Sequence, residues 1–191
     1  DLGTVEPWVR DYLAERGVLG TSVLWFEKDA DGEPLRPEEY RELVLATINT
    51  HDLPPTAGYL AEEHVDLRER LGLLTEAAPI VRAEARRERE RMVARLREYD
   101  LLPDNPTERQ LVEALHAYIT LTPSRLVGVA LTDAVGERRA QNQPGTDTEY
   151  PNWKLPLADG SENVVLVEDL PDIARLRSLL GVVRELMPRR P

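Results

Sequence analysis

The chain has 191 residues, of which 41% are hydrophobic and 31% are charged, as in a globular protein with one sizeable core or two small ones. A formal net charge of −11 argues against nucleic acid as a partner, because that binding depends on Lys and Arg neutralising phosphates. No apolar run approaches the roughly 20 residues that cross a bilayer, so we expect no membrane insertion, and the lack of cysteine excludes disulfides and thiolate metal sites.

A short helix and a strand are the first elements expected along the chain. Pro7 suits a first helical position and Gly17 a C-terminal cap, and between them the apolar residues keep helical spacing. Next, Ser22–Phe26 (SVLWF) is a compact run of branched and aromatic residues, which is typical of a strand covered on both faces. The segment EKDADGEPLRP that follows is a polar loop.

The second apolar run, Leu43–Ile48, has the same buried-strand pattern, although its Leu and Ala leave a helix open for the first half. It ends in TINTHDLPPT, where His51 and Asp52 stand side by side and two prolines prevent continuation. A plain turn would need only Gly, Asn or Asp. An imidazole beside a carboxylate at a strand end therefore suggests a functional site.

From Pro55 to about Asp100 the pattern is helical, with the charged stretch RAEARRERERMVARLREYD expected as a solvated helix face rather than an anion-binding surface. Two ion pairs at i, i+3 spacing are expected on it, Glu84 with Arg87 and Glu88 with Arg91. Asn105 and Pro106 restart a helix, with Glu108 completing a capping-box-like start. His116 lies beside the buried stripe of that helix and is expected at the core edge. The three histidines of the chain are too scattered for metal binding, so we predict no metal site.

Leu126–Leu131 (LVGVAL) is the cleanest buried strand, and it ends in Thr132-Asp133. A long polar loop follows, then a strand-like VVLV and a C-terminal helix from Pro171 to Met187. The alternation of helices with apolar strands indicates an α/β fold with parallel strands. No internal repeat is apparent.

A nucleotide-binding fold lacks its best support, because no Gly-x-Gly-x-x-Gly or Walker-type loop follows any strand. A (β/α) barrel instead carries its chemistry at the C-terminal ends of its strands, which is where His51, Asp52 and Asp133 fall.

Four motifs go beyond a fold class: DLGTV, THDLPPTAGY, NQPGT and NWK, in this order along the chain. Each alone is weak, but in this order they resemble the C-terminal part of the 4-alpha-glucanotransferases, the amylomaltase or disproportionating-enzyme family of the alpha-amylase clan. The resemblance covers essentially the whole chain. It implies that residues 1–191 are the C-terminal portion of a catalytic (β/α)8 barrel of TIM type, incomplete as an isolated chain, with strands near 22–26, 43–48 and 126–131 and a helical insertion over about 55–119.

The resemblance also implies roles for individual residues. Asp52 would be a catalytic carboxylate that grips sugar hydroxyls as the ring flattens toward an oxocarbenium-like transition state. His51, Asn142, Asn152 and Trp153 would bind substrate, since amides offer donors and acceptors to hydroxyls and an indole offers a flat apolar platform. Asp133 resembles a strand-end Asp of the family and is open to a structural reading.

Two other catalytic carboxylates of the family have no counterpart in this chain. Asp1-Leu2-Gly3 resembles the tail of a Glu-Asp-Leu-Gly motif whose Glu is the acid/base, and the nucleophilic Asp would lie further upstream. A retaining double displacement needs both of those groups, about 5 to 5.5 Å apart. The chain alone is therefore expected to be inactive, and its unpaired strands are expected to make it self-associate.

The resemblance favours part of a cytoplasmic 4-alpha-glucanotransferase that transfers alpha-1,4-glucan segments between maltodextrins. A cytoplasmic location is compatible with the absence of cysteine. No cofactor is expected, because carboxylates supply the acid, base and nucleophile. The alternatives are a non-catalytic glucan-binding or regulatory module and an unrelated α/β interaction domain.

Overall fold

The computed structural model describes residues 6–187, so the motif Asp1-Leu2-Gly3 lies outside the described residues. Three parallel strands form one sheet in the order β1-β2-β3, with β1 over Gly20–Val23, β2 over Val44–Thr47 and β3 over Leu126–Val127. Gly20 pairs with Val44, and Leu45 pairs with Leu126. The predicted mixed α/β fold with parallel strands is confirmed, and the strand alternative for residues 43–48 is the correct one.

The strand ends differ from the prediction. After β1 the chain turns into a 3-10 helix, η1, over Leu24–Phe26, and β3 has only two residues, because the ladder stops after the bond from Gly128 N to Ala46 O at 2.8 Å. Helix α6, Leu131–Val135, begins where the strand was predicted to end. Leu24 and Trp25 are buried in the turn after β1, as their apolar run predicts. The prediction of a buried strand over Leu126–Leu131 is wrong, since Leu126 and Leu131 are 50% and 45% exposed and the residues between them are only partly buried.

The strand-like VVLV is also not a strand. Val164 makes an isolated bridge with Ala158, and Val167 begins a 3-10 helix, η3, over Val167–Asp172. The side chains of this run are largely exposed, with Val167 79% exposed, so no sheet or helix covers them. The prediction of a strand was wrong because it depended on burial of these four apolar residues.

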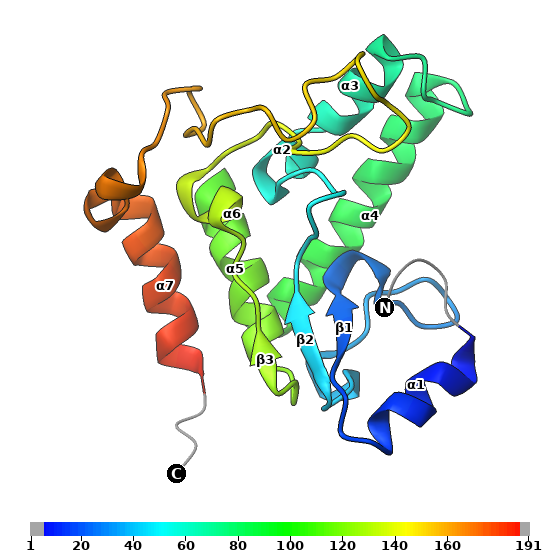
Figure 1. Ribbon diagram of the computed structural model, residues 1–191. Helices are drawn as coiled ribbons and strands as arrows, with labels where there is room; N and C mark the ends of the chain where they lie inside the picture. Colours follow the sequence, from blue (N-terminus) through cyan, green and yellow to red (C-terminus); the bar gives the residue numbers. More distant parts are fainter. Residues whose placement is uncertain (1–5, 188–191) are drawn as a thin grey trace.

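Helices fill most of the remaining chain (Figure 1). They are α1 over Pro7–Ala14, α2 over Thr56–Leu60, α3 over Glu63–Arg70, α4 over Ala78–Glu98, α5 over Glu108–Thr120 and α7 over Ala174–Leu186. The helical character predicted for residues 55–119 is confirmed. Helix α5 is capped by Thr107 rather than by Asn105-Pro106, and Gln110 rather than the predicted Glu108 completes the capping box. The Thr107 hydroxyl accepts from Gln110 N at 3.3 Å, and Gln110 Oε1 accepts from Thr107 N at 2.9 Å.

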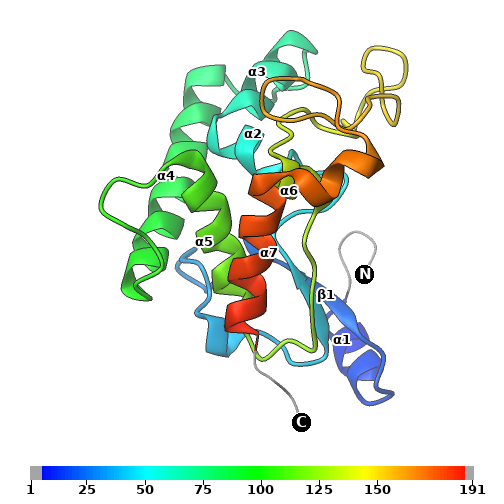
Figure 2. The ribbon, with the colours of Figure 1, turned by 90° about the vertical axis from the view of Figure 1, so that its left-hand side faces the viewer.

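The core lies where α5 packs on β2 and α4 packs on α5, and Figure 2 shows α4, α5 and α7 gathered on the same side of the strands. The buried stripe predicted for α5 is confirmed at Leu111, Val112, Leu115, Tyr118 and Ile119. It meets Ala46 and Ile48 from the sheet and Met92 and Leu96 from α4. His116, expected at the core edge, is fully buried.

The arginine-rich helix α4 fastens loops as well as facing water. Arg87 and Glu84 pair at 4.0 Å, as predicted. The predicted Glu88–Arg91 pair is wrong, because Glu88 binds Lys28 and the Tyr59 hydroxyl while Arg91 Nη1 donates to Gly32 O at 2.9 Å. The loop after η1, which contains Lys28 and Gly32, therefore lies against this face of α4. Sequence spacing alone does not predict this contact.

Two distant turns share one hydrogen-bonding frame, although no repeat is apparent in the sequence. We call them the Asp turns, Asp29–Glu33 and Asp159–Asn163. In each, the first aspartate Oδ1 accepts two backbone N–H groups, from the third and fifth positions, at 2.8 to 3.0 Å. The fourth positions, Gly32 and Glu162, have φ of +78° and +63°. Only the leading aspartate and the backbone are common to both.

Candidate functional site

A pocket of about 390 Å³ opens where β2 and β3 end. Its walls come from the segment after β2, from the short run after β3 and from the loop that Figure 1 draws in yellow near the top of the molecule. The lining residues are Thr47, Asn49, Thr50, His51, Leu53, Pro55, Gly128, Val129, Ala130, Leu131, Thr132, Gln141 and Trp153. Two of the five predicted site residues, His51 and Trp153, are among them.

The segment from Asn49 to Thr56 turns the chain from β2 into α2. Leu53 N donates to Thr50 O at 3.2 Å, and Asp52 N lies 3.3 Å from Thr50 Oγ1. Pro54 and Pro55 keep the backbone extended until Thr56 begins the helix. The tip of the turn therefore presents His51 and Asp52 to solvent, with side chains 60% and 49% exposed.

The structure brings Asp52 together with two of its predicted companions. Asn142 Nδ2 donates to Asp52 Oδ1 at 2.7 Å across 90 positions of sequence, and His51 Nε2 lies 3.3 Å from Asp52 Oδ2. Asp52 stands at the rim, since His51 lines the pocket and Asp52 itself does not. A half-exposed carboxylate oriented by an amide can accept hydrogen bonds from two hydroxyls of a bound ligand.

Trp153 stands over His51 with ring centroids 5.2 Å apart and planes inclined by 43°. Its indole is 64% exposed, its backbone N–H donates to Gln141 O at 2.9 Å, and its φ is +61°. A large side chain rarely adopts this left-handed backbone, which is found mainly where function requires a particular placement. The two rings form an aromatic wall at the pocket mouth.

Asn152, the fifth predicted site residue, holds the NQPGT loop together through its side-chain amide. Its Oδ1 accepts from Gln143 N at 2.8 Å, and its Nδ2 donates to Thr146 Oγ1 at 2.8 Å and to Thr146 O at 3.3 Å. Both amide protons are thereby used inside the NQPGT loop, so the geometry favours a framing role. Direct contact between Asn152 and a ligand stays a prediction.

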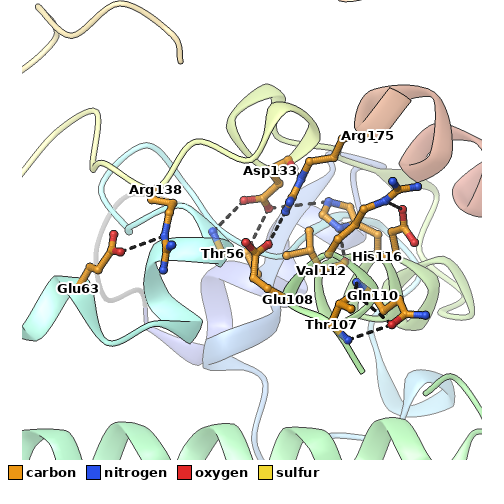
Figure 3. Close-up of polar contacts among 12 residues, drawn as sticks. Thr56, Glu63, Thr107, Glu108, Gln110, Val112, His116, Asp133, Arg138 and Arg175 are labelled. Atoms are coloured by element: carbon orange, nitrogen blue, oxygen red, sulfur yellow. Dashed lines mark hydrogen bonds and ion pairs between the residues drawn. The ribbon is translucent and has the colours of Figure 1, made fainter. Parts of the chain in front are cut away.

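A buried polar cluster lies beneath the pocket (Figure 3). Asp133, fully buried in α6, accepts from Thr56 N at 2.8 Å, from Thr56 Oγ1 at 2.7 Å and from Asn49 Nδ2 at 3.2 Å. His116 Nε2 lies 3.9 Å from Asp133 Oδ2. Burial lowers the pKa of His116, and the negative charge of Asp133 opposes that shift.

Sequence reasoning missed several residues of this region. Asn49, Thr56 and His116 carried no signal of their proximity to Asp133, because their contacts span up to 84 positions. The sequence predicts a polar loop at Gln141 and a strand over Leu126–Leu131 that ends at Thr132, and neither prediction places these residues in a pocket wall. The only signal for them was position, next to NQPGT and to the end of β3.

In the part of the chain from residue 6 to residue 187, no group of three or more His, Asp or Glu side chains could hold a metal ion. The expectation that no cofactor is needed stays a prediction. Over the same residues, none of the helices is both long and apolar enough to cross a membrane.

Comparison with known proteins gives consistent matches. A protein-family model described as 4-alpha-glucanotransferase matches residues 1–161. The chain is 54% identical over 190 residues to the 4-alpha-glucanotransferases of Mycobacterium tuberculosis and Mycobacterium bovis, covering 96% of this chain and 26% of each relative. It is 30% identical over 167 residues to that of Haemophilus influenzae, covering 83% of this chain and 24% of the relative.

Among solved structures, amylomaltase from Corynebacterium glutamicum superposes with a TM-score of 0.90 at 45% identity, over 96% of this chain and 28% of that one. An amylomaltase from Streptococcus agalactiae, solved with acarbose, gives 0.52 at 20% identity over 96% of this chain and 31% of that one, which supports the fold alone. The chain thus spans about a quarter of the length of the curated relatives it matches.

Proposed function

Because the chain belongs to the 4-alpha-glucanotransferase family, we propose that it forms part of the glucan site of such an enzyme. The observation that carries this proposal is the placement of Asp52 between Asn142 and His51 at the rim of a pocket that Trp153 also lines. The substrates would be maltodextrins, whose rings have apolar faces and edges crowded with hydroxyls.

Asp52 is the catalytic carboxylate of this proposal. When a glycosidic bond breaks, the sugar ring flattens and gains positive charge. A fixed carboxylate that accepts adjacent ring hydroxyls stabilises this state more than the ground state, because the hydroxyls become better donors as charge develops. The amide of Asn142 donates to Oδ1 and His51 Nε2 lies 3.3 Å from Oδ2, and the remaining lone pairs of both oxygens would accept from the sugar.

The aromatic wall would hold the glucan in register. A sugar ring stacked on Trp153 would place its hydroxyl edge toward His51 and Asp52, since these side chains adjoin one another. Asn142 would then be a substrate contact through its carbonyl oxygen, while its amide nitrogen orients Asp52.

The remaining chemistry would come from other parts of a longer enzyme. A retaining transfer needs a nucleophile and an acid/base in addition to Asp52, and the relatives are about four times as long as the match. In this proposal the three parallel strands belong to a (β/α)8 barrel, whose C-terminal strand ends gather the three carboxylates.

The test is Asp52→Asn in the intact enzyme, assayed by conversion of maltotriose into glucose and longer glucans. We expect kcat to fall by about a hundredfold or more, with folding unchanged, because the lost charge acts chiefly in the transition state. The matched control is Asp104→Asn, an exposed loop aspartate expected to keep wild-type kcat.

Near-normal turnover of Asp52→Asn would contradict the catalytic role. An intact wild-type protein that binds maltotriose without converting it would instead identify a non-catalytic glucan-binding module.

A further inference from the structure

One buried carboxylate holds both ends of the segment that carries Asp52. Asp133 accepts from the side chain of Asn49 at the start of the segment and from the backbone N–H and hydroxyl of Thr56 at its end. Asn49 Nδ2 also lies 3.3 Å from Thr56 Oγ1. The eight residues from Asn49 to Thr56 are thus closed into a loop on a single side chain of α6.

The loop has little internal structure to fix its tip. Its internal bonds join Leu53 N to Thr50 O at 3.2 Å and Asp52 N to Thr50 Oγ1 at 3.3 Å, both within one turn. The tip is half-exposed, whereas Asp133 is completely buried. The rigid reference for the backbone of residues 49–56 is therefore the buried anchor, while Asn142 orients the Asp52 side chain from outside the loop.

Asp133 lies between side chains of α5 and α7, as Figure 3 shows. His116 on α5 places Nε2 3.9 Å from the carboxylate, but its Nδ1 contacts the carbonyl of Val112 at 2.8 Å and carries the proton, so the neutral ring donates no hydrogen bond to Asp133. From α7, Arg175 Nε lies 3.4 Å from Asp133 O while its Nη2 pairs with Glu108 of α5. Helices α5, α6 and α7 together fix the anchor.

We propose that Asp133 is a positioning residue for Asp52, which it places by holding Asn49 and Thr56 at the two ends of the loop. This inference rests on the proposed function, since it assigns Asp133 a part in the rate that Asp52 provides. Asp133 is separated from the pocket by the residues it binds, so it touches no substrate. Its effect belongs in kcat rather than in KM.

The experiment compares Asp133→Asn with the exchanged pair Asn49→Asp/Asp133→Asn in the intact enzyme. Asparagine at 133 has one acceptor oxygen where Asp133 has two, so it cannot accept from Thr56 N, Thr56 Oγ1 and Asn49 Nδ2 together, and the closure is broken. In the exchanged pair the oxygen of the amide at position 133 accepts from Thr56 N while its nitrogen donates to the carboxylate at position 49. The Thr56 hydroxyl, which lies 3.3 Å from Asn49 Nδ2 in the wild type, then donates to that carboxylate, and the closure is restored. We expect kcat on maltotriose to fall about tenfold to a hundredfold in Asp133→Asn, with KM within about threefold, and to recover in the exchanged pair.

Leu96→Ala is the stability control. Leu96 is buried in α4, a helix outside the α5, α6 and α7 group that fixes the anchor, so its truncation should lower Tm while kcat measured well below Tm stays at the wild-type value. Wild-type kcat in a folded Asp133→Asn enzyme, or an exchanged pair that regains Tm but not kcat, would overturn the inference. Should Asp133→Asn fail to fold, the kcat of the exchanged pair against Leu96→Ala still decides.

Hydrogen exchange separates this inference from the proposed function. If the intact wild-type protein transfers no glucan, the proposed function fails. The exchange rate of the amides in residues 49–56 then tests the anchor, since it should rise in Asp133→Asn and return in the exchanged pair. Unchanged exchange in Asp133→Asn would refute the anchoring role whatever the activity.

Discussion

The backbone of Trp153 has a φ of +61°, a left-handed conformation that costs an L-residue roughly 1–2 kcal/mol. The hydrogen bond from its own N–H to Gln141 O and the amide frame of Asn152 maintain it. Strain kept in place by neighbours is a reason to look for function, and the indole here faces His51 across the pocket mouth.

Replacing Trp153 by Ala in the intact enzyme should raise KM for maltotriose about five- to thirtyfold, as loss of about 1–2 kcal/mol of stacking and apolar contact requires. Alanine meets the same φ penalty as Trp, so the change reports the ring and not the backbone. Trp8→Ala, which removes an indole 63% exposed on α1, is the matched control. Equal KM values for the two variants would show that the aromatic wall does not bind the glucan.

At the scale of elements, the stack of Trp25, Tyr59 and His64 joins η1, α2 and α3. The ring centroids of Trp25 and Tyr59 lie 4.4 Å apart, and those of Tyr59 and His64 lie 4.6 Å apart. Burial lowers the pKa of His64 to about 4, and the nearby charge of Arg68 adds to the shift. The neutral imidazole is therefore the form that the folded chain accommodates.

The sign of the resulting pH dependence follows from linkage. As pH falls from about 6.5, the unfolded chain takes up a proton at residue 64 before the folded chain does, so the free energy of unfolding decreases until pH reaches about 4. The loss is at most about 3 kcal/mol, and less to the extent that water reaches the ring. His64→Phe keeps a stacking ring without titration.

Urea denaturation of wild type and His64→Phe between pH 7 and pH 4 checks this prediction. The variant should lose less stability than wild type across that range. Part of the pH dependence of its stability should remain, because burial also lowers the pKa of His116. Parallel curves for the two proteins would contradict the assignment to His64.

Elements differed in how far the sequence determined them. The apolar stripe of α5 and the centre of β2 were predictable because periodicity reports which face is buried. The lengths of β1 and β3 were not, since Leu24 and Trp25 are buried in a turn. The motif order predicted Asp52, His51, Asn142 and Trp153 as site residues, and the folded chain brings the first three into contact and places Trp153 beside His51. No local pattern predicts contacts such as Asn49 to Asp133, which lie 84 positions apart.

At the scale of the whole molecule, the sheet order β1-β2-β3 leaves β1 and β3 each paired along one edge. Apolar side chains stand exposed near both edges, with Phe26 67% and Leu126 50% exposed. Edges and apolar patches of this kind favour association with other protein surfaces.

The 191-residue chain by itself is expected to self-associate and to return maltotriose unchanged, because the proposed nucleophile and acid/base belong to other segments. Light scattering coupled to gel filtration measures the first property, and chromatography of the incubated sugar measures the second. A monomeric chain that produces glucose and longer glucans would contradict both the proposed division of catalytic groups and the incompleteness of the sheet.

The two Asp turns show how little of a pentapeptide a backbone can specify. DADGE and DGSEN share only their first letter, yet Asp29 and Asp159 gather the same N–H groups. The two turns share aspartate at the first position and a residue with positive φ at the fourth, while the residues at the other three positions differ. Many different sequences can therefore form the same turn. A search for sequence repeats misses the pair of Asp turns, whereas a comparison of their hydrogen-bond patterns reveals it.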